Sequence, residues 1–84
     1  MKKLTLDSCA VYRICVQGTL DQKCSDNLQD MTISTEHDES RHPVSTLTGQ
    51  LVDQAALLGV LYTLYNIYHL PLLVVECLSV HEMP

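Results

Sequence analysis

Residues 37–42 form the densest group of potential metal ligands in the sequence, with the side chains of His37, Asp38, Glu39 and His42. Imidazole and carboxylate groups at this spacing could hold a divalent transition metal. The same polar residues, followed by Pro43, are also typical of a solvated turn that joins two strands. We interpret the segment as a turn and predict no metal site.

Cysteine chemistry is the second possibility, and the sequence contains four cysteines, Cys9, Cys15, Cys24 and Cys77. An even number suggests disulfides in a secreted chain. However, Asp7 and Arg13 interrupt the apolar N-terminal segment, so it lacks the form of a signal peptide. We therefore predict reduced thiols and a cytoplasmic location. Cys15 and Cys77 could fall on neighbouring strands, either as a redox pair or as two small buried side chains, and the second is the ordinary case.

The sequence lacks the motifs of the common catalytic sites: a Gly-rich phosphate loop, a nucleophile elbow and a His-Glu-x-x-His zinc motif. Ten acidic and five basic residues give a net charge of −5. This charge disfavours nucleic acid and anionic membranes, because phosphate binding requires clustered Lys and Arg. No apolar segment reaches the roughly 20 residues that span a bilayer. We predict no cofactor, no nucleic-acid partner and no membrane partner.

The segment 46–78 contains the element around which the rest of the chain is organised. Asp53 precedes Gln-Ala-Ala-Leu-Leu and can accept hydrogen bonds from the first free N–H groups of a helix. Pro71 cannot continue a helix and disfavours helical backbone at Leu70. The spacing predicts a helix over 53–69, whose core-facing stripe consists of Leu57, Val60, Leu61, Leu64, Ile67 and Tyr68.

A second row on this helix has the same spacing and contains Leu58, Tyr62, Tyr65 and His69. A solvated helix face normally carries charges, yet no charged residue follows Asp53 in the helix. We interpret the row as a packing surface for another molecule. Filling of the chain's own core and the lining of a ligand cleft are the alternatives.

The remaining segments complete an α+β fold. Alternating apolar residues predict strands at 11–16, 31–36, 44–48 and 72–78, with a loop or short helix within 21–30. This order is that of a ferredoxin-like β(α)ββαβ domain: a four-stranded antiparallel sheet with one main helix and a reduced first helix. Right-handed crossovers give the strand order 4-1-3-2. We expect a leader at 1–9, weakly ordered or docked on the sheet, a single domain at 10–80, and a tail at 81–84.

The last strand is predicted to be an apolar edge strand, with Leu73, Val75 and Cys77 facing the helix and Leu72, Val74 and Leu78 facing the other side. An exposed apolar edge promotes association unless it is covered. We expect a second copy to cover it; the alternative is that Leu4 and Leu6 of the leader fold over it. The predicted interface residues are Leu58, Tyr62, Tyr65, His69, Leu72, Val74 and Leu78.

The second half of the chain also resembles a set of short uncharacterised bacterial proteins. The resemblance rests on Leu47-Thr48-Gly49, on 52–57 with 59–61, and on Leu70-Pro71-Leu72-Leu73 with Val75-Glu76, which read LTG…DQAALxGVL…LPLLxVE. A looser match covers 12–20. These proteins have no assigned activity, so the resemblance implies the element order and a bacterial cytoplasmic origin but transfers no catalytic residue.

Together these observations predict a small cytoplasmic interaction or regulatory module that self-associates, with a dimer as the first expectation, and has no catalytic activity. Another protein partner, if there is one, is not specified by the sequence. The alternative is a small-molecule-binding domain with its ligand held between subunits or between helix and sheet, an analogy from fold alone. A small isomerase-like enzyme is less favoured, because the predicted inward positions are almost wholly apolar.

Overall fold

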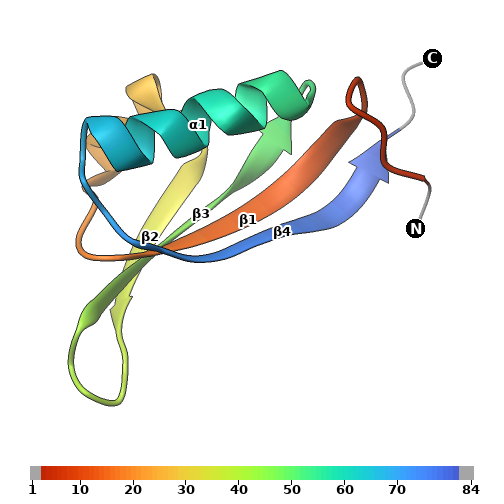
Figure 1. The fold of residues 1–84 in the computed structure, drawn as a ribbon. Coiled ribbons are helices and arrows are strands. Elements are labelled where there is room, and N and C mark those ends of the chain that lie inside the picture. The colour runs from red at the N-terminus through yellow and green to blue at the C-terminus, as the bar shows by residue number, and fades with distance from the viewer. Residues whose placement is uncertain (1–2, 82–84) are drawn as a thin grey trace.

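The computed structural model describes residues 3–81, and Figure 1 shows their arrangement. The elements in chain order are β1 (Cys9–Gln17), a 3₁₀ helix η1 (Gln22–Asn27), β2 (Thr32–His37), β3 (Pro43–Leu51), α1 (Gln54–Asn66) and β4 (Leu72–His81). This order confirms the predicted ferredoxin-like β(α)ββαβ arrangement of the α+β class, in which η1 replaces the first helix. Of the predicted leader and tail, residues 1–2 and 82–84 lie outside the described range.

The four strands form one antiparallel sheet in the order β2-β3-β1-β4, which confirms the predicted neighbours of every strand. The central strand β1 pairs with β3 on one side and with β4 on the other. Ile14, for example, lies opposite Leu47 of β3 and opposite Val75 of β4. β4 is therefore an edge strand of the sheet, as expected.

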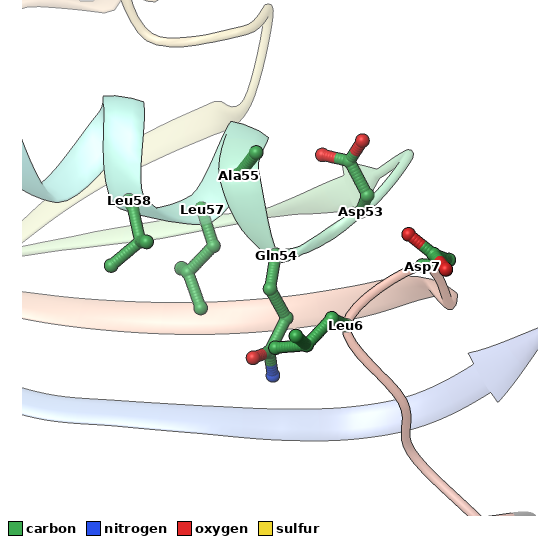
Figure 2. A pocket seen from close by; sticks show the side chains of 7 residues that line it. All are labelled: Leu6, Asp7, Asp53, Gln54, Ala55, Leu57 and Leu58. Carbon is green, nitrogen blue, oxygen red and sulfur yellow. The ribbon is translucent and has the colours of Figure 1, made fainter.

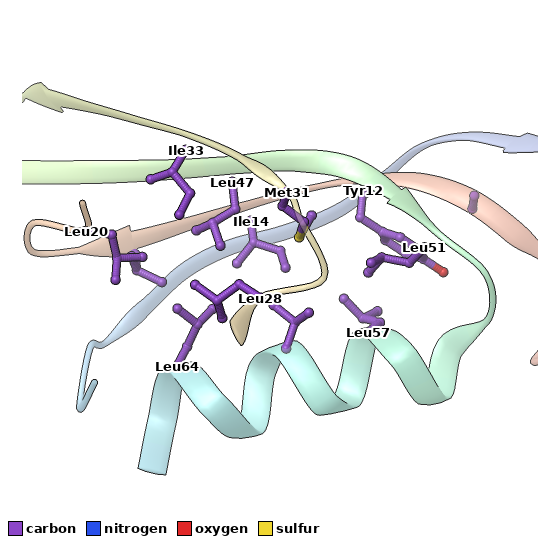
Figure 3. Packing of buried hydrophobic residues seen from close by; sticks show 13 residues of the cluster. Tyr12, Ile14, Leu20, Leu28, Met31, Ile33, Leu47, Leu51, Leu57 and Leu64 are labelled. Carbon is purple, nitrogen blue, oxygen red and sulfur yellow. The ribbon is translucent and has the colours of Figure 1, made fainter. Parts of the chain in front are cut away.

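The hydrophobic core lies between α1 and one face of the sheet, as Figure 3 shows. Alternate residues of β1 point into it because side chains along a strand alternate between the two faces. The fully or almost fully buried members include Tyr12, Ile14, Val16, Leu28, Met31, Leu47, Leu51, Val60 and Leu64. The opposite face of the sheet carries half-exposed and exposed side chains such as Arg13, Thr48 and Ser34, and we call it the open face.

Ser45 is the buried polar residue of this core among residues 3–81. Its hydroxyl donates to the carbonyl oxygen of Gly18 at 2.8 Å and accepts from the N–H of Leu20 at 2.9 Å. The hydroxyl of Thr35 lies 2.9 Å away. A buried hydroxyl costs free energy unless it is hydrogen-bonded. These partners satisfy Ser45, and its bonds hold the loop that follows β1 against the sheet.

Asp53 caps the start of α1 as predicted, because its Oδ1 accepts the N–H of Ala56 at 2.8 Å. We expect Asp53→Ala to lower the free energy of unfolding by about 1 kcal/mol, since an N–H at the helix start loses its acceptor. Urea denaturation followed by circular dichroism measures this loss. Asp53→Asn is the control, because it keeps an oxygen acceptor. A loss as large for Asp53→Asn as for Asp53→Ala would contradict the capping role.

The end of α1 corrects the predicted helix of 53–69, since the helix ends at Asn66. His69 adopts a left-handed φ of +55°, and the N–H of Leu70 donates to the carbonyl oxygen of Leu64 at 3.1 Å. A left-handed residue followed by such a bond is a common way to terminate a helix. Ile67, which was predicted to face the core, lies beyond the last turn and is exposed.

β4 does not follow the simple alternation that we predicted for 72–78, because its pairing with β1 contains two register shifts. Val74 lies opposite Cys15, but Leu72 lies opposite Val16, so Leu73 has no partner on β1. A second shift leaves Leu78 without a partner. Leu72 is therefore paired with a residue of the buried face and Val74 with a residue of the open face. Such irregularities are β-bulges, and they are frequent at sheet edges.

The register also separates the two cysteines that were considered as a redox pair. Cys77 lies opposite Tyr12 on the core side, whereas Cys15 lies opposite Val74 on the open face, with its Sγ 3.6 Å from the hydroxyl of Thr46. The side chains therefore point to opposite faces of the sheet and cannot form a disulfide with each other. All four cysteines are free thiols, and Cys9 is buried.

Candidate interaction surface

The predicted row on α1 is exposed. Leu58, Tyr62 and Tyr65 retain 65–69% of their accessible surface, whereas Leu57, Val60 and Leu64 on the adjoining side of the helix are buried. Leu58 leaves α1 on the side of β1 and β4, as Figure 2 shows. Tyr62 and Tyr65 follow it at i+4 and i+7 and lie on the same flank. His69 is also exposed, but it lies in the turn after the helix and does not continue the row.

Apolar side chains of β4 form the second part of the exposed surface. Leu72, Leu73, Val74, Val75 and Leu78 retain 40–49% of their accessible surface. The sequence predicted that Leu73, Val75 and Cys77 face the helix. Val75 and Cys77 do lie on the core side of the sheet, opposite the buried Ile14 and Tyr12, whereas Leu73 has no partner on β1. Val75 nevertheless retains 42% of its accessible surface.

The position of α1 explains why β4 is uncovered. The buried residues of α1 share one core cluster with Ile14 of β1 and Leu47 of β3, and η1 packs against β2. Strands are spaced about 4.8 Å apart and a helix with its side chains is about 10 Å wide, so one helix covers roughly two strands. α1 thus covers β3 and β1, and η1 covers part of β2. On the core side of β4, Cys77 still packs against the core, but Leu72 and Val75 remain exposed.

The predicted interface residues therefore divide between two faces of the molecule. Leu58, Tyr62, Tyr65 and Leu72 lie on the side of the helix together with Val75, and we call these five residues the helix-side surface. Val74 lies on the open face. Val75 was not among the predicted interface residues, because we expected it to face the helix. The only signal for the exposure was the shortness of the polar segment 21–30, which is too brief for a full second helix.

A groove at the start of α1 adjoins this surface. Its volume is about 290 Å³, and Figure 2 shows the residues that line it: Leu6, Asp7, Asp53, Gln54, Ala55, Leu57 and Leu58. The carbonyl oxygen of Leu6 accepts the N–H of Gln54 at 3.0 Å, and Leu4 packs against the core. The N-terminal segment therefore docks at the start of α1, while the side chain of Leu6 remains 75% exposed.

Charge is distributed unevenly between the two edges of the molecule. The segment 54–81, which contains α1 and β4, has a single Asp, Glu, Lys or Arg, namely Glu76. Glu76 forms an ion pair with Arg13 across the open face. The segment 21–41, which contains η1, β2 and the following turn, carries six acidic and two basic residues and hence four of the five net negative charges. The helix-side surface is thus uncharged, and the opposite edge is acidic.

The residues considered for a metal site lie in the turn between β2 and β3. Asp38 Oδ1 accepts the N–H groups of Ser40 and His42 at 2.9 and 2.8 Å. The carboxylate therefore stabilises the turn, and His42 Nδ1 lies 3.9 Å from its other oxygen. Within residues 3–81, no group of three or more His, Cys, Asp or Glu side chains converges in a way that could hold a metal ion.

Fold and surface together define a class: a small α+β domain whose most distinctive feature is an apolar, uncharged helix flank beside an uncovered edge strand. Residues 11–76 match the family described as a domain of unknown function (DUF8691), and the chain belongs to this family. The matched range contains every segment of the LTG…DQAALxGVL…LPLLxVE signature. No curated protein and no solved structure gives a significant match. In the described part of the chain, no helix has the length and apolar character needed to cross a membrane.

Proposed function

We propose that this protein is a small self-associating module that acts through protein–protein contact and has no catalytic activity of its own. The observation that carries the proposal is the helix-side surface, an apolar and uncharged area built from two elements. Large contiguous apolar patches on small soluble domains usually mark interaction sites. The four free cysteines support a reducing, cytoplasmic location, and the signature supports a bacterial origin.

Self-association can be tested by sedimentation velocity of the full chain at tens of micromolar. We expect a species with twice the 9.4 kDa mass of the chain. On dilution this dimer should dissociate into monomers as mass action requires. A single species of 9.4 kDa at every concentration would overturn the proposal.

A small-molecule-binding domain is the second candidate, and the groove beside Leu6 is the observation that favours it. Its volume of about 290 Å³ is slightly below the roughly 300–1,000 Å³ of ligand pockets. The groove has apolar walls from Leu6, Leu57 and Leu58, and the carboxamide of Gln54 lies beside the Tyr12 hydroxyl at 3.4 Å. Titration of the ¹⁵N-labelled chain with a library of small apolar fragments tests this candidate. Shifts confined to the groove residues would support it, and their absence would count against it.

An isomerase-like enzyme has less support. Such an enzyme needs several polar groups that converge on an apolar pocket. The acidic residues of the groove, Asp7 and Asp53, lie at its rim, and Asp53 is already engaged as the helix cap. Asp53 therefore already has a structural role as the cap of α1.

A further inference from the structure

We propose that two copies of the chain meet about a twofold axis, so that α1 of each copy lies over the uncovered β4 of the other. The two helices would form one layer between two outer sheets. This inference rests on the proposed self-association and specifies which surface is used. It assigns the helix-side surface, and not the open face of the sheet, as the site that binds the second copy.

Each copy lacks an element that the other can provide. A four-stranded sheet requires about two helices to cover one face, since one helix covers roughly two strands. This chain provides α1 and the six-residue η1, and Leu72 and Val75 on the core side of β4 remain exposed. A twofold axis repeats each contact, so a helix placed over β4 of one copy places the other helix over β4 of its partner.

Val75 and Tyr62 lie at the same level along the helix. Val75 lies opposite Ile14, and Figure 3 places Ile14 between Leu57 and Leu64 along α1. Val75 is therefore level with the middle of the helix, where Tyr62 also lies. A twofold axis that passes beside α1, level with its middle, brings Tyr62 of one copy to Val75 of the other. Tyrosine suits such a contact, because it is a large and rigid side chain that is enriched at interfaces.

The exposed apolar area on this side of the molecule also fits a dimer interface. An exposed leucine or tyrosine side chain of this kind offers roughly 100 Å². The helix-side surface and the adjacent Leu6 therefore provide on the order of 500 Å² of apolar area, against about 800 Å² of total area per partner in a standard interface. A polar rim normally supplies the remaining area. The surface is thus large enough for the apolar centre of a dimer interface.

The distribution of charge also favours contact through the helix-side surface. Two copies with a net charge of −5 each repel one another, and the cost is smallest when their acidic edges are far apart. Contact through α1 and β4 uses the uncharged side of each molecule and leaves the acidic 21–41 segments on the outside. The open face is less suitable, because the Arg13–Glu76 ion pair and several Thr and Ser side chains cover it.

Charge substitutions at exposed positions test the arrangement by sedimentation velocity. Tyr62→Lys and Val75→Glu should each raise the dissociation constant of the dimer by about thirtyfold or more. The double variant Tyr62→Lys/Val75→Glu should regain most of that loss, because each Lys would face a Glu of the other copy. The matched control is Val74→Glu, which changes the neighbouring and equally exposed valine on the open face and should leave the dimer intact. Circular dichroism spectra and melting curves verify that each variant is folded.

The outcomes separate this inference from the proposed function. A wild-type chain that is monomeric overturns both. A wild-type dimer that dissociates with Val74→Glu but not with Val75→Glu overturns the arrangement and leaves self-association intact. A double variant that dimerises as weakly as the single variants also overturns it. In that case α1 would contact α1 and β4 would contact β4, so that Lys would face Lys and Glu would face Glu.

Discussion

Leu64→Ala is expected to lower the free energy of unfolding by about 2–5 kcal/mol, the usual range for removing a fully buried leucine side chain. Leu64 has no accessible surface and belongs to the core cluster that joins α1 to the sheet, with Ile14 and Leu28 among its members. The substitution removes buried apolar atoms and leaves a cavity that the surrounding side chains fill only in part. Such a loss is a large share of the stability of a domain of this size.

Urea denaturation at a protein concentration below that at which the chain associates measures the effect, because association and folding would otherwise be mixed. Leu58→Ala is the matched control, since it removes the same side chain from the same helix at an exposed position. We expect the monomer's stability to change by less than about 0.5 kcal/mol in that variant. Equal losses for Leu58→Ala and Leu64→Ala would show that the assigned core face of α1 is wrong.

Gly18→Ala is the second substitution with a large expected effect, a loss of about 2–3 kcal/mol. Gly18 has a φ of +129°, which residues with a Cβ rarely adopt. An added Cβ would lie 2.5 Å from Cδ2 of Leu70, so that side chain must move as well. The backbone of Gly18 cannot relax freely, because its N–H donates to Pro43 and its carbonyl oxygen accepts from Ser45.

Gly59→Ala is the control for Gly18→Ala and should have the opposite sign. Gly59 lies inside α1, and a Cβ built there meets no atom within 4 Å. Alanine is a better helix former than glycine by roughly 0.5–1 kcal/mol, so we expect a gain of that size. Thermal melts of both variants measure the two effects. A stabilised Gly18→Ala variant would contradict the role assigned to the loop between β1 and η1.

Much of the fold could be predicted from local chemistry. Asp53 marks the start of α1 because few residue types can accept the free N–H groups there, and the observed bond to Ala56 confirms it. The alternation in 11–16 predicted a strand with one buried face, and Tyr12, Ile14 and Val16 are buried as expected. The strand order followed from the element order and the handedness of crossovers. Each of these features depends on a single segment or on a general rule of chain topology.

The features that were missed depend on contacts between distant segments. Pro71 marks where the helix must have ended, but it does not specify the left-handed turn at His69 that ends it earlier. The β-bulges at Leu73 and Leu78 arise from the pairing of β4 with β1, and alternation within β4 gives no sign of them. The exposure of Val75 depends on where α1 lies across the sheet, which is a property of the packed domain.

The candidate surface shows the same division. The sequence indicated that Leu58, Tyr62 and Tyr65 form an uncharged row outside the core stripe, and the structure places all three in solvent. It did not indicate that Leu72 and Val74 are paired with opposite faces of the sheet, because that follows from the register shift between them. The residue types therefore predicted that an apolar surface is present. The shape of this surface could not be predicted, because it depends on how α1 and β4 pack in the folded domain.

The two bulges of β4 also limit how this apolar edge strand can act as a template for pairing with further chains. Between them, regular pairing with β1 extends only over Val74–Cys77, and Glu76 lies within this stretch. Fibril-forming segments are typically six or seven residues long with little charge. Four regular residues that include a carboxylate are too few for further chains to add in succession along the edge. The bulges thus disfavour the addition of further chains along this exposed apolar edge strand.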